Sequence, residues 1–182
     1  LTLAHHGVVD AQTSKLDLAG LAGHIGVVDD PVVQGAVILV LQGAQGVGDP
    51  FQGILDLTDA YAVTSGGYQR YFEQDGKRYH HIIDPATGYP AESGLLQVTV
   101  VAGADAARED DGNPAGTGTM CDAFSTALFV MGEEKALDFW RSGAYEFDLI
   151  LVTDDGRVLV TDGLADRFTP MNGSEYSYET VS

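Results

Sequence analysis

The chain has 182 residues, of which 45% are hydrophobic, and its 27 acidic and 9 basic side chains give a formal net charge of −18. This is enough for one domain with a hydrophobic core, and no apolar run approaches the roughly 20 residues that a membrane-spanning helix needs. A surface this acidic repels nucleic acid and anionic membranes, so neither is an expected partner, and a pyrophosphate ligand would need a divalent cation to screen the charge.

The first third of the chain is expected to be mainly β. Residues 15–26 mix apolar residues with glycines, which is typical of a strand that runs into a tight backbone feature. Asp17 lies in this apolar company, and such a carboxylate usually has a partner. Residues 42–53 are rich in glycine and are expected to form a loop. Strands are predicted at Ala36–Leu41, Gly53–Leu57 and Ala60–Thr64.

A hairpin is predicted after a small-residue turn. Residues 64–68, Thr-Ser-Gly-Gly-Tyr, can form a turn that brings backbone N–H groups close to a ligand, or a plain turn. Residues 68–73 and 77–83 are then expected to pair as strands. The reason is the segment Gln74-Asp75-Gly76 between them, which carries the Asp-Gly signature of a hairpin.

The second hairpin strand leads into two histidines and a rigid turn. Pro85 pushes Asp84 out of the helical region, and Gly88 can adopt the positive φ that closes the turn. Since side chains alternate along a strand, His80 and His81 point to opposite faces, and at most one of them points at a given site. Such a histidine suits proton or phosphate chemistry near neutral pH, or it only satisfies hydrogen bonds.

The second half of the chain combines strands with helices. Helical spacing begins at Thr119, which forms an N-capping pair with Asp122, and Gly132 is a plausible C-terminal stop. A second helix is predicted over Glu133–Arg141. The buried face of the first helix is expected to contain Ala123, Ala127, Val130 and Met131. Strands are predicted at 95–102, 147–153 and 157–161, and a polar tail follows.

These elements predict an α+β fold. The sheet is expected to be mostly antiparallel, with the helices of Thr119–Arg141 packed on one face. The single cysteine, Cys121, excludes an internal disulfide and a cysteine-based zinc cluster. It is either a nucleophile or a small buried residue at a helix start, and the second interpretation is favoured.

Asp122 and Thr126 form a candidate metal-binding pair. Residues four apart in a helix share one face with about 5–6 Å between their Cβ atoms, and an oxygen pair so placed suits a hard cation. Two side chains are too few for calcium but fit magnesium, which keeps waters and substrate phosphates as further ligands. The alternative is that Asp122 caps the helix and Thr126 bonds its own backbone.

Two long motifs carry a resemblance to a known family. Residues 64–93 include Thr-Ser-Gly-Gly-Tyr and His-Ile-Ile-Asp-Pro-Ala-Thr-Gly-Tyr-Pro, and residues 122–132 read Asp-Ala-Phe-Ser-Thr-Ala-Leu-Phe-Val-Met-Gly. Together they resemble the ApbE family of FAD:protein FMN transferases. The resemblance covers about residues 54 to 168. It implies a single ApbE-like domain over residues 1–182, with residues 1–53 divergent or incomplete.

The resemblance implies an enzyme that splits FAD with Mg²⁺, joins FMN to a threonine of a target protein and releases AMP. The implied target is a subunit of a membrane electron-transport complex. The first residues show no signal-peptide pattern, and an extracytoplasmic, membrane-associated setting is implied by the family alone. Open alternatives are a FAD pyrophosphatase that gives FMN and AMP, an inactive flavin- or metal-binding remnant, and an acidic α+β domain that binds neither.

Candidate site residues follow by position from the same resemblance. His81 is the motif histidine, implied in FAD binding and turnover, either as a proton acceptor or as a residue that orients the phosphate. The implied FAD contacts are Asp17, Thr64, Ser65, Gly66 and His81. The implied metal ligands are the Gly20 carbonyl, Asp122, Ser125 and Thr126.

The amino-terminal third departs from the family pattern. The family's Asp-Leu-Gly-x-x-Ala-Lys-Gly stretch lacks its lysine here, as though one residue were deleted after Ala22. The Gly-Gly-Asp/Asn segment that normally follows the next strand is replaced by residues 42–46. Loss of the lysine removes a cation from a site already poor in positive charge, which favours weak FAD binding or inactivity.

Overall fold

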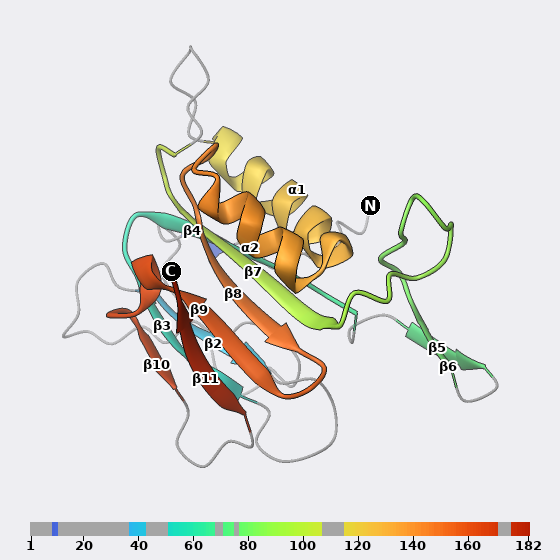
Figure 1. Cartoon of the computed structure of the whole chain (residues 1–182). Helices are drawn as coiled ribbons and strands as arrows, with labels where there is room; N and C mark the ends of the chain where they lie inside the picture. The colour runs from blue at the N-terminus through green and yellow to red at the C-terminus, as the bar shows by residue number, and fades with distance from the viewer. Residues whose placement is uncertain are drawn as a thin grey trace.

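The computed structural model describes residues 9–10, 37–42, 51–67, 71–74, 77–106, 115–170 and 176–182. A six-stranded sheet lies at the centre of this described part (Figure 1). Every neighbouring pair of its strands is antiparallel except the last pair, which is parallel. In spatial order the strands are β1 (Val9–Asp10), β4 (Ala60–Gly66), β7 (Leu95–Gly103), β8 (Asp148–Thr153), β9 (Arg157–Thr161) and β11 (Ser177–Val181).

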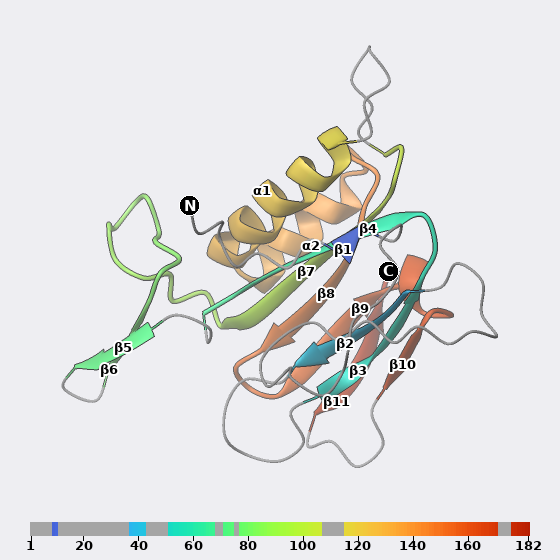
Figure 2. The same cartoon turned by 180° about the vertical axis from the view of Figure 1, so that it is seen from behind.

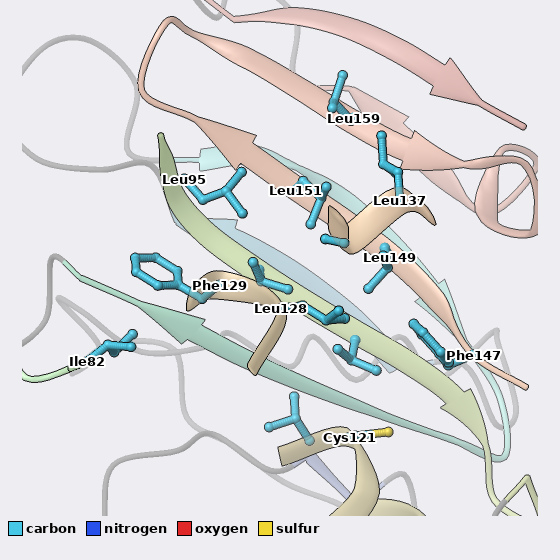
Figure 3. Close-up of a cluster of buried hydrophobic side chains, with 14 of the residues drawn as sticks. Ile82, Leu95, Cys121, Leu128, Phe129, Leu137, Phe147, Leu149, Leu151 and Leu159 are labelled. Carbon is cyan, nitrogen blue, oxygen red and sulfur yellow. The ribbon is translucent and has the colours of Figure 1, made fainter. Parts of the chain in front are cut away.

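Two helices, α1 (Ala115–Met131) and α2 (Glu133–Arg141), cover one face of this sheet (Figure 1). Figure 3 shows the buried cluster between the two layers, to which alternate residues of the strands contribute. Several of its large members are at most 1% exposed, among them Phe129, Leu128, Leu149 and Leu151. Each such side chain contributes roughly 1.5–3 kcal/mol by its removal from water, so this interface is a main source of stability.

A second sheet covers the opposite face of the central sheet (Figure 2). It contains β10 (Phe168–Pro170), β3 (Phe51–Leu57) and β2 (Val37–Gln42) in that order, and both pairings are antiparallel. The remaining alternate residues of the central sheet pack here against Leu55 and Leu57, for example Ala62, Val101, Ile150 and Val152. The described residues therefore form three layers, which confirms the α+β fold and the helices on one face.

The predicted hairpin is confirmed as a separate two-stranded sheet. Its strands, β5 (Tyr71–Gln74) and β6 (Lys77–His80), are antiparallel and project from the layered body (Figures 1 and 2). Every side chain of β5 is exposed, and the rings of Phe72 and Tyr79 stack on each other at a centroid distance of 5.0 Å. β6 ends earlier than predicted, because the chain bends at His81.

The Asp-Pro turn after the hairpin is also confirmed. The N–H of Gly88 donates to the Asp84 carbonyl oxygen at 2.8 Å, and Gly88 has a φ of +73°. The Asp84 carboxylate accepts a further hydrogen bond from the N–H of Ala86 at 2.8 Å. At the base of this loop, Ile82 and Ala91 are only 4% and 6% exposed, so both ends of the loop are anchored in the helix-side core.

Two predictions about α1 are wrong. The helix begins at Ala115, so Asp122 lies inside it and does not form an N-capping pair with Thr119. The second wrong prediction concerns the buried face of the helix. α1 lies close to the sheet, since a Cβ on Gly118 would lie 3.2 Å from the Tyr61 ring. Small and hydroxyl side chains suit so close an interface. The buried face consists of Thr117, Cys121, Ser125, Leu128 and Phe129. Of the residues expected there, Val130 is half-buried and the others are exposed: Ala123, Ala127 and Met131.

Some of the other predicted boundaries are confirmed, whereas some elements near the C-terminus were missed. The stop after α1 is confirmed, with Gly132 at a φ of +82°, and the bounds of α2 and β9 are those predicted. The expected polar tail instead contains β10, β11 and a short 3-10 helix, η2 (Asp162–Leu164). These elements are short, and β11 is exposed or half-buried along its length, so they lack an apolar alternation. Neither described helix is both long and apolar enough to cross a lipid bilayer.

Candidate functional site

Three hydroxyl groups meet where β4 faces α1. β4 runs to Gly66, so the turn predicted at residues 64–68 is wrong for its first three residues. Strand alternation directs Ser65 toward α1, where its Oγ lies 2.8 Å from Ser125 Oγ and 3.0 Å from Thr126 Oγ1. Ser125 donates in turn to the Asp122 carbonyl oxygen at 2.9 Å.

The direction of these hydrogen bonds follows from the single hydrogen that each hydroxyl carries. Ser125 gives its hydrogen to the Asp122 carbonyl oxygen, so Ser65 must be the donor to Ser125. Ser65 then has no hydrogen left, and Thr126 must be the donor to Ser65. The side chains of β4 and α1 are thus fixed relative to each other, and the Thr126 oxygen keeps lone pairs for a ligand.

Asp122 lies one helical turn before Thr126, and the oxygen atoms of the two side chains are ligands that suit a hard cation. The Oδ1 atom of Asp122 is buried and makes no hydrogen bond, although the residue has other interactions. Within the described residues, no three His, Cys, Asp or Glu side chains group as metal ligands, so a cation here would depend on one carboxylate together with hydroxyl and carbonyl oxygens. Magnesium accepts such an incomplete set, because it keeps waters and phosphate oxygens.

The alternative interpretation, in which Asp122 caps the helix and Thr126 bonds its own backbone, is wrong in both parts. Asp122 cannot cap a helix that begins seven residues earlier, at Ala115. The hydrogen bond of Thr126 goes to Ser65 on the neighbouring strand, which ties the helix to the sheet.

The other predicted site residues have different positions. Thr64 points to the opposite face of β4, where its Oγ1 lies 2.8 Å from Thr99 Oγ1 on β7. Gly66 is buried and follows Ser65 on the same strand. Asp17 and Gly20 lie outside the described residues. The roles of these residues in FAD or metal binding stay predictions.

The two histidines are placed differently at the end of β6. His81 is exposed at the bend. His80 is half-buried, and its ring meets Phe129 of α1 edge-on, with centroids 5.6 Å apart and an interplanar angle of 87°. The histidine that faces α1 is therefore His80, which the sequence analysis did not select. Strand alternation indicated that at most one of the two would point at a given site, but which one it is depends on how the hairpin meets the body.

A cavity of about 380 Å³ opens beside His80. Its lining combines the apolar side chains of Phe129 and Leu95 with the backbone of Gly67 and the acidic residues Glu92 and Asp154. Phe129 follows Ser125 by one helical turn, so α1 contributes both to the hydroxyl cluster and to the cavity lining. The lining includes His80 but neither His81 nor the cluster residues Ser65, Asp122, Ser125 and Thr126.

Burial favours the neutral form of His80. Removal of the ring from water lowers its pKa from the ordinary value of 6.5, and the positive charge of the neighbouring His81 acts in the same direction. The hydrogen bond to the Ala91 backbone opposes these two effects. Near neutral pH the His80 ring is therefore uncharged.

Cys121 takes no part in this site. Its side chain is fully buried, and burial raises the pKa of its thiol to about 12. A nucleophile of this kind needs a thiolate, which is not formed near neutral pH at such a pKa. The interpretation as a small buried residue is confirmed, although Cys121 lies within α1 and not at its start.

Comparison with known proteins gives a consistent set of matches. The model of the family described as the ApbE family matches residues 21–151. Proteins named FAD:protein FMN transferase are 39% identical over 117 residues in Treponema pallidum (strain Nichols) and 38% identical over 120 residues in Klebsiella pneumoniae (strain 342). A crystal structure of the ApbE protein of Thermotoga maritima superposes with a TM-score of 0.58 at 33% identity.

These matches cover most of this chain but a minor part of each relative. They include 63% and 66% of this chain for the Treponema and Klebsiella proteins, and 74% for the Thermotoga structure. The shares of the relatives are 28%, 34% and 38%. The chain therefore spans about a third of the length of the relatives that it matches.

Proposed function

The chain belongs to the ApbE family, and on this basis we propose that it acts in the Mg²⁺-dependent transfer of FMN from FAD to a threonine of a target protein, with release of AMP. One structural observation carries the proposal. Ser125 and Thr126 present hydroxyl oxygens from α1 beside the end of β4, within one helical turn of Asp122. The chain that contains them is 38–39% identical, over 117 to 120 residues, to proteins named FAD:protein FMN transferase.

The residues of α1 would hold the metal ion. Asp122, Ser125 and Thr126 are the proposed ligands, together with the carbonyl of Gly20 from outside the described residues. When bound, Mg²⁺ neutralises the pyrophosphate and stabilises the charge that develops at phosphorus. The hydrogen bonds of Ser65 fix the rotamers of Ser125 and Thr126, so their oxygen atoms are oriented before a ligand binds.

The transfer exchanges one phosphorus–oxygen bond for another. The threonine oxygen forms a bond to the FMN phosphorus, the bond to the bridging oxygen breaks, and AMP leaves with that oxygen. His81 either accepts the proton of the threonine hydroxyl or orients the phosphate, and its exposed position gives a protein substrate access to it. The proposed FAD contacts are Asp17, Thr64, Ser65, Gly66 and His81.

The proposed target is a subunit of a membrane electron-transport complex in an extracytoplasmic, membrane-associated setting. A formal net charge of −18 repels anionic lipid, so contact with the membrane would run through the target protein and not through lipid headgroups.

The test incubates the purified chain with FAD, Mg²⁺ and a recombinant target domain that carries the acceptor threonine. A fluorescent flavinylated band together with AMP is the expected result, and chelation of Mg²⁺ should remove both. Asp122→Asn is the matched variant, because it keeps the size of the side chain but removes the negative charge.

The control omits the target. If FMN and AMP form at the same rate without the target, the chain hydrolyses FAD as a pyrophosphatase and does not transfer FMN. A folded chain that binds FAD but forms neither FMN nor AMP would indicate an inactive flavin-binding remnant. A folded chain that binds neither FAD nor Mg²⁺ would contradict the proposal altogether.

A further inference from the structure

His80 joins the two ends of the loop that follows the hairpin. Its Nε2 lies 3.1 Å from the Ala91 carbonyl oxygen, and its Nδ1 lies 3.3 Å from the backbone nitrogen of Ile82. The N–H of Ala91 donates in turn to the carbonyl oxygen of Ile82 at 3.0 Å. These three hydrogen bonds form a closed ring through one imidazole, and the bond to Ile82 also spans His81.

A single form of the imidazole makes both of its bonds. A carbonyl oxygen only accepts and a backbone N–H only donates, so Nε2 must carry a hydrogen and Nδ1 must not. This is the neutral Nε2–H tautomer. Protonation of Nδ1 would set its new N–H against the N–H of Ile82 and break one of the three bonds. The burial of the ring favours the same neutral form.

The neighbours of His80 fix the plane of its ring. Phe129 of α1 meets it edge-on, and a Cβ at position 67 would lie 2.9 Å from its Cδ2 atom, so Gly67 leaves the space that the ring occupies. Neither of these two neighbours titrates. Among the described residues, the ionisable groups nearby include His81 in the same segment, Tyr71 opposite His80 on β5, and Glu92 and Asp154 in the lining of the shared cavity.

We propose that His80 is a positioning residue: by closing the loop of residues 82–91 it holds His81 and one wall of the cavity in place for the reaction. The effect on turnover rests on the proposed function, whereas the closure of the loop does not. His80 is not assigned a catalytic role, since both of its ring nitrogens are engaged with backbone groups.

Three substitutions separate the parts of this arrangement. His80→Phe keeps a ring against Phe129 but loses both hydrogen bonds. His80→Gln places a donor near Nε2, and His80→Asn places an acceptor near Nδ1, so each restores one bond. Ser142→Ala is the control, because it removes two exposed side-chain hydrogen bonds at the end of α2, far from this loop in the sequence.

The first measurement follows amide hydrogen exchange at Ile82 in the full chain as a function of pH. Because the pKa of His80 is lowered, we expect protection of Ile82 to be complete above about pH 6.5 and to fall as acid protonates the ring. His80→Phe should show weak protection with no pH step, and His80→Asn should protect Ile82 better than His80→Gln. Equal protection in wild type and His80→Phe would overturn the proposal.

The second measurement compares turnover of FAD. Misplacement of His81 should lower kcat of His80→Phe by roughly 10- to 100-fold, with a smaller change in KM for FAD, and His80→Gln or His80→Asn should recover part of the loss. Ser142→Ala should behave as wild type. An active wild type with an equally active His80→Phe would overturn the positioning role. An inactive wild type would instead count against the proposed function, and hydrogen exchange would then decide the claim about the loop.

Discussion

The packing of α1 against β4 and the segment from the hairpin to Ala91 meet where Phe129 and His80 line one cavity, but different forces hold them. The first rests on fully buried side chains such as Cys121, Leu128 and Ser125. The second is exposed along β5, and its loop is anchored by Ile82, Ala91 and the hydrogen bonds of His80. Apolar burial does not depend on protonation, whereas a bond to a neutral imidazole does. The proposed metal ligands on α1 therefore lie on the side held by burial, and the proposed catalytic histidine lies on the side that responds to pH.

The largest effect should come from Phe129→Ala, which removes a fully buried side chain from α1 and the ring against which His80 packs. Loss of the apolar contacts and the cavity left behind should cost about 3–5 kcal/mol of unfolding free energy. Urea unfolding followed by circular dichroism measures this cost.

Ala127→Gln on the exposed face of α1 is the control and should change stability by less than about 0.5 kcal/mol. A cost below about 1 kcal/mol for Phe129→Ala would mean that this part of the helix is not tightly packed.

Gly67→Ala should have the next largest effect, because it acts where the two regions meet. The new methyl group would lie 2.9 Å from the His80 ring, so we expect a loss of roughly 1–3 kcal/mol and weaker amide protection of Ile82. Gly103→Ala is the matched control, since the nearest atom to its Cβ would be 3.6 Å away. Similar effects of the two substitutions would contradict the close packing of His80 against residue 67.

The hydroxyl cluster is tested by a double-mutant cycle of Ser65→Ala and Ser125→Ala. Each substitution leaves a polar partner without its hydrogen bond, so each should cost about 1–2 kcal/mol. Since the two oxygens lie 2.8 Å apart, the double variant should be more stable than the sum of the single losses predicts, by about 0.5 kcal/mol or more. Additive losses would show that the two hydroxyls do not act together.

The smallest effect is expected at the ion pair of Arg157 and Glu133, neither of which lines the cavity. The two guanidinium nitrogens donate to the carboxylate at 2.9 and 2.6 Å, but both side chains are about a third exposed. Glu133→Gln should therefore cost less than about 1 kcal/mol of unfolding free energy, and added salt should reduce the difference in stability between wild type and variant. Unfolding midpoints at low and high salt give the comparison, and a loss above about 2 kcal/mol would place this pair among the main stabilising contacts.

The parts of the fold that the sequence predicted are those with strong local signals. The Asp-Gly segment fixed the hairpin, Gly132 fixed the end of α1, and the Asp-Pro turn was recognised from Pro85 and Gly88. β10 and β11 carried no such signal, because short strands with exposed side chains resemble a polar tail. The start of α1 was missed because the glycines at 116 and 118 favour a loop locally, whereas Gly118 serves here in close packing against the Tyr61 ring of β4.

The candidate site was likewise predicted only where the signal is local. Helical spacing brought Asp122 and Thr126 to one face, although the helix position assumed for them was wrong. The contribution of Ser65 to their hydrogen bonding depends on a contact between residues 60 positions apart, which no local pattern contains. The choice between His80 and His81 likewise depends on tertiary contacts with Phe129 and Gly67.

The most direct test of the metal and FAD site at α1 is the retention of FAD by the purified chain with and without Mg²⁺, in wild type and in Asp122→Asn. Wild type is expected to retain FAD only when Mg²⁺ is present, and Asp122→Asn should lose most of this retention while its unfolding transition stays cooperative. Equal retention by the two proteins, or retention that does not depend on Mg²⁺, would contradict a cation site on α1.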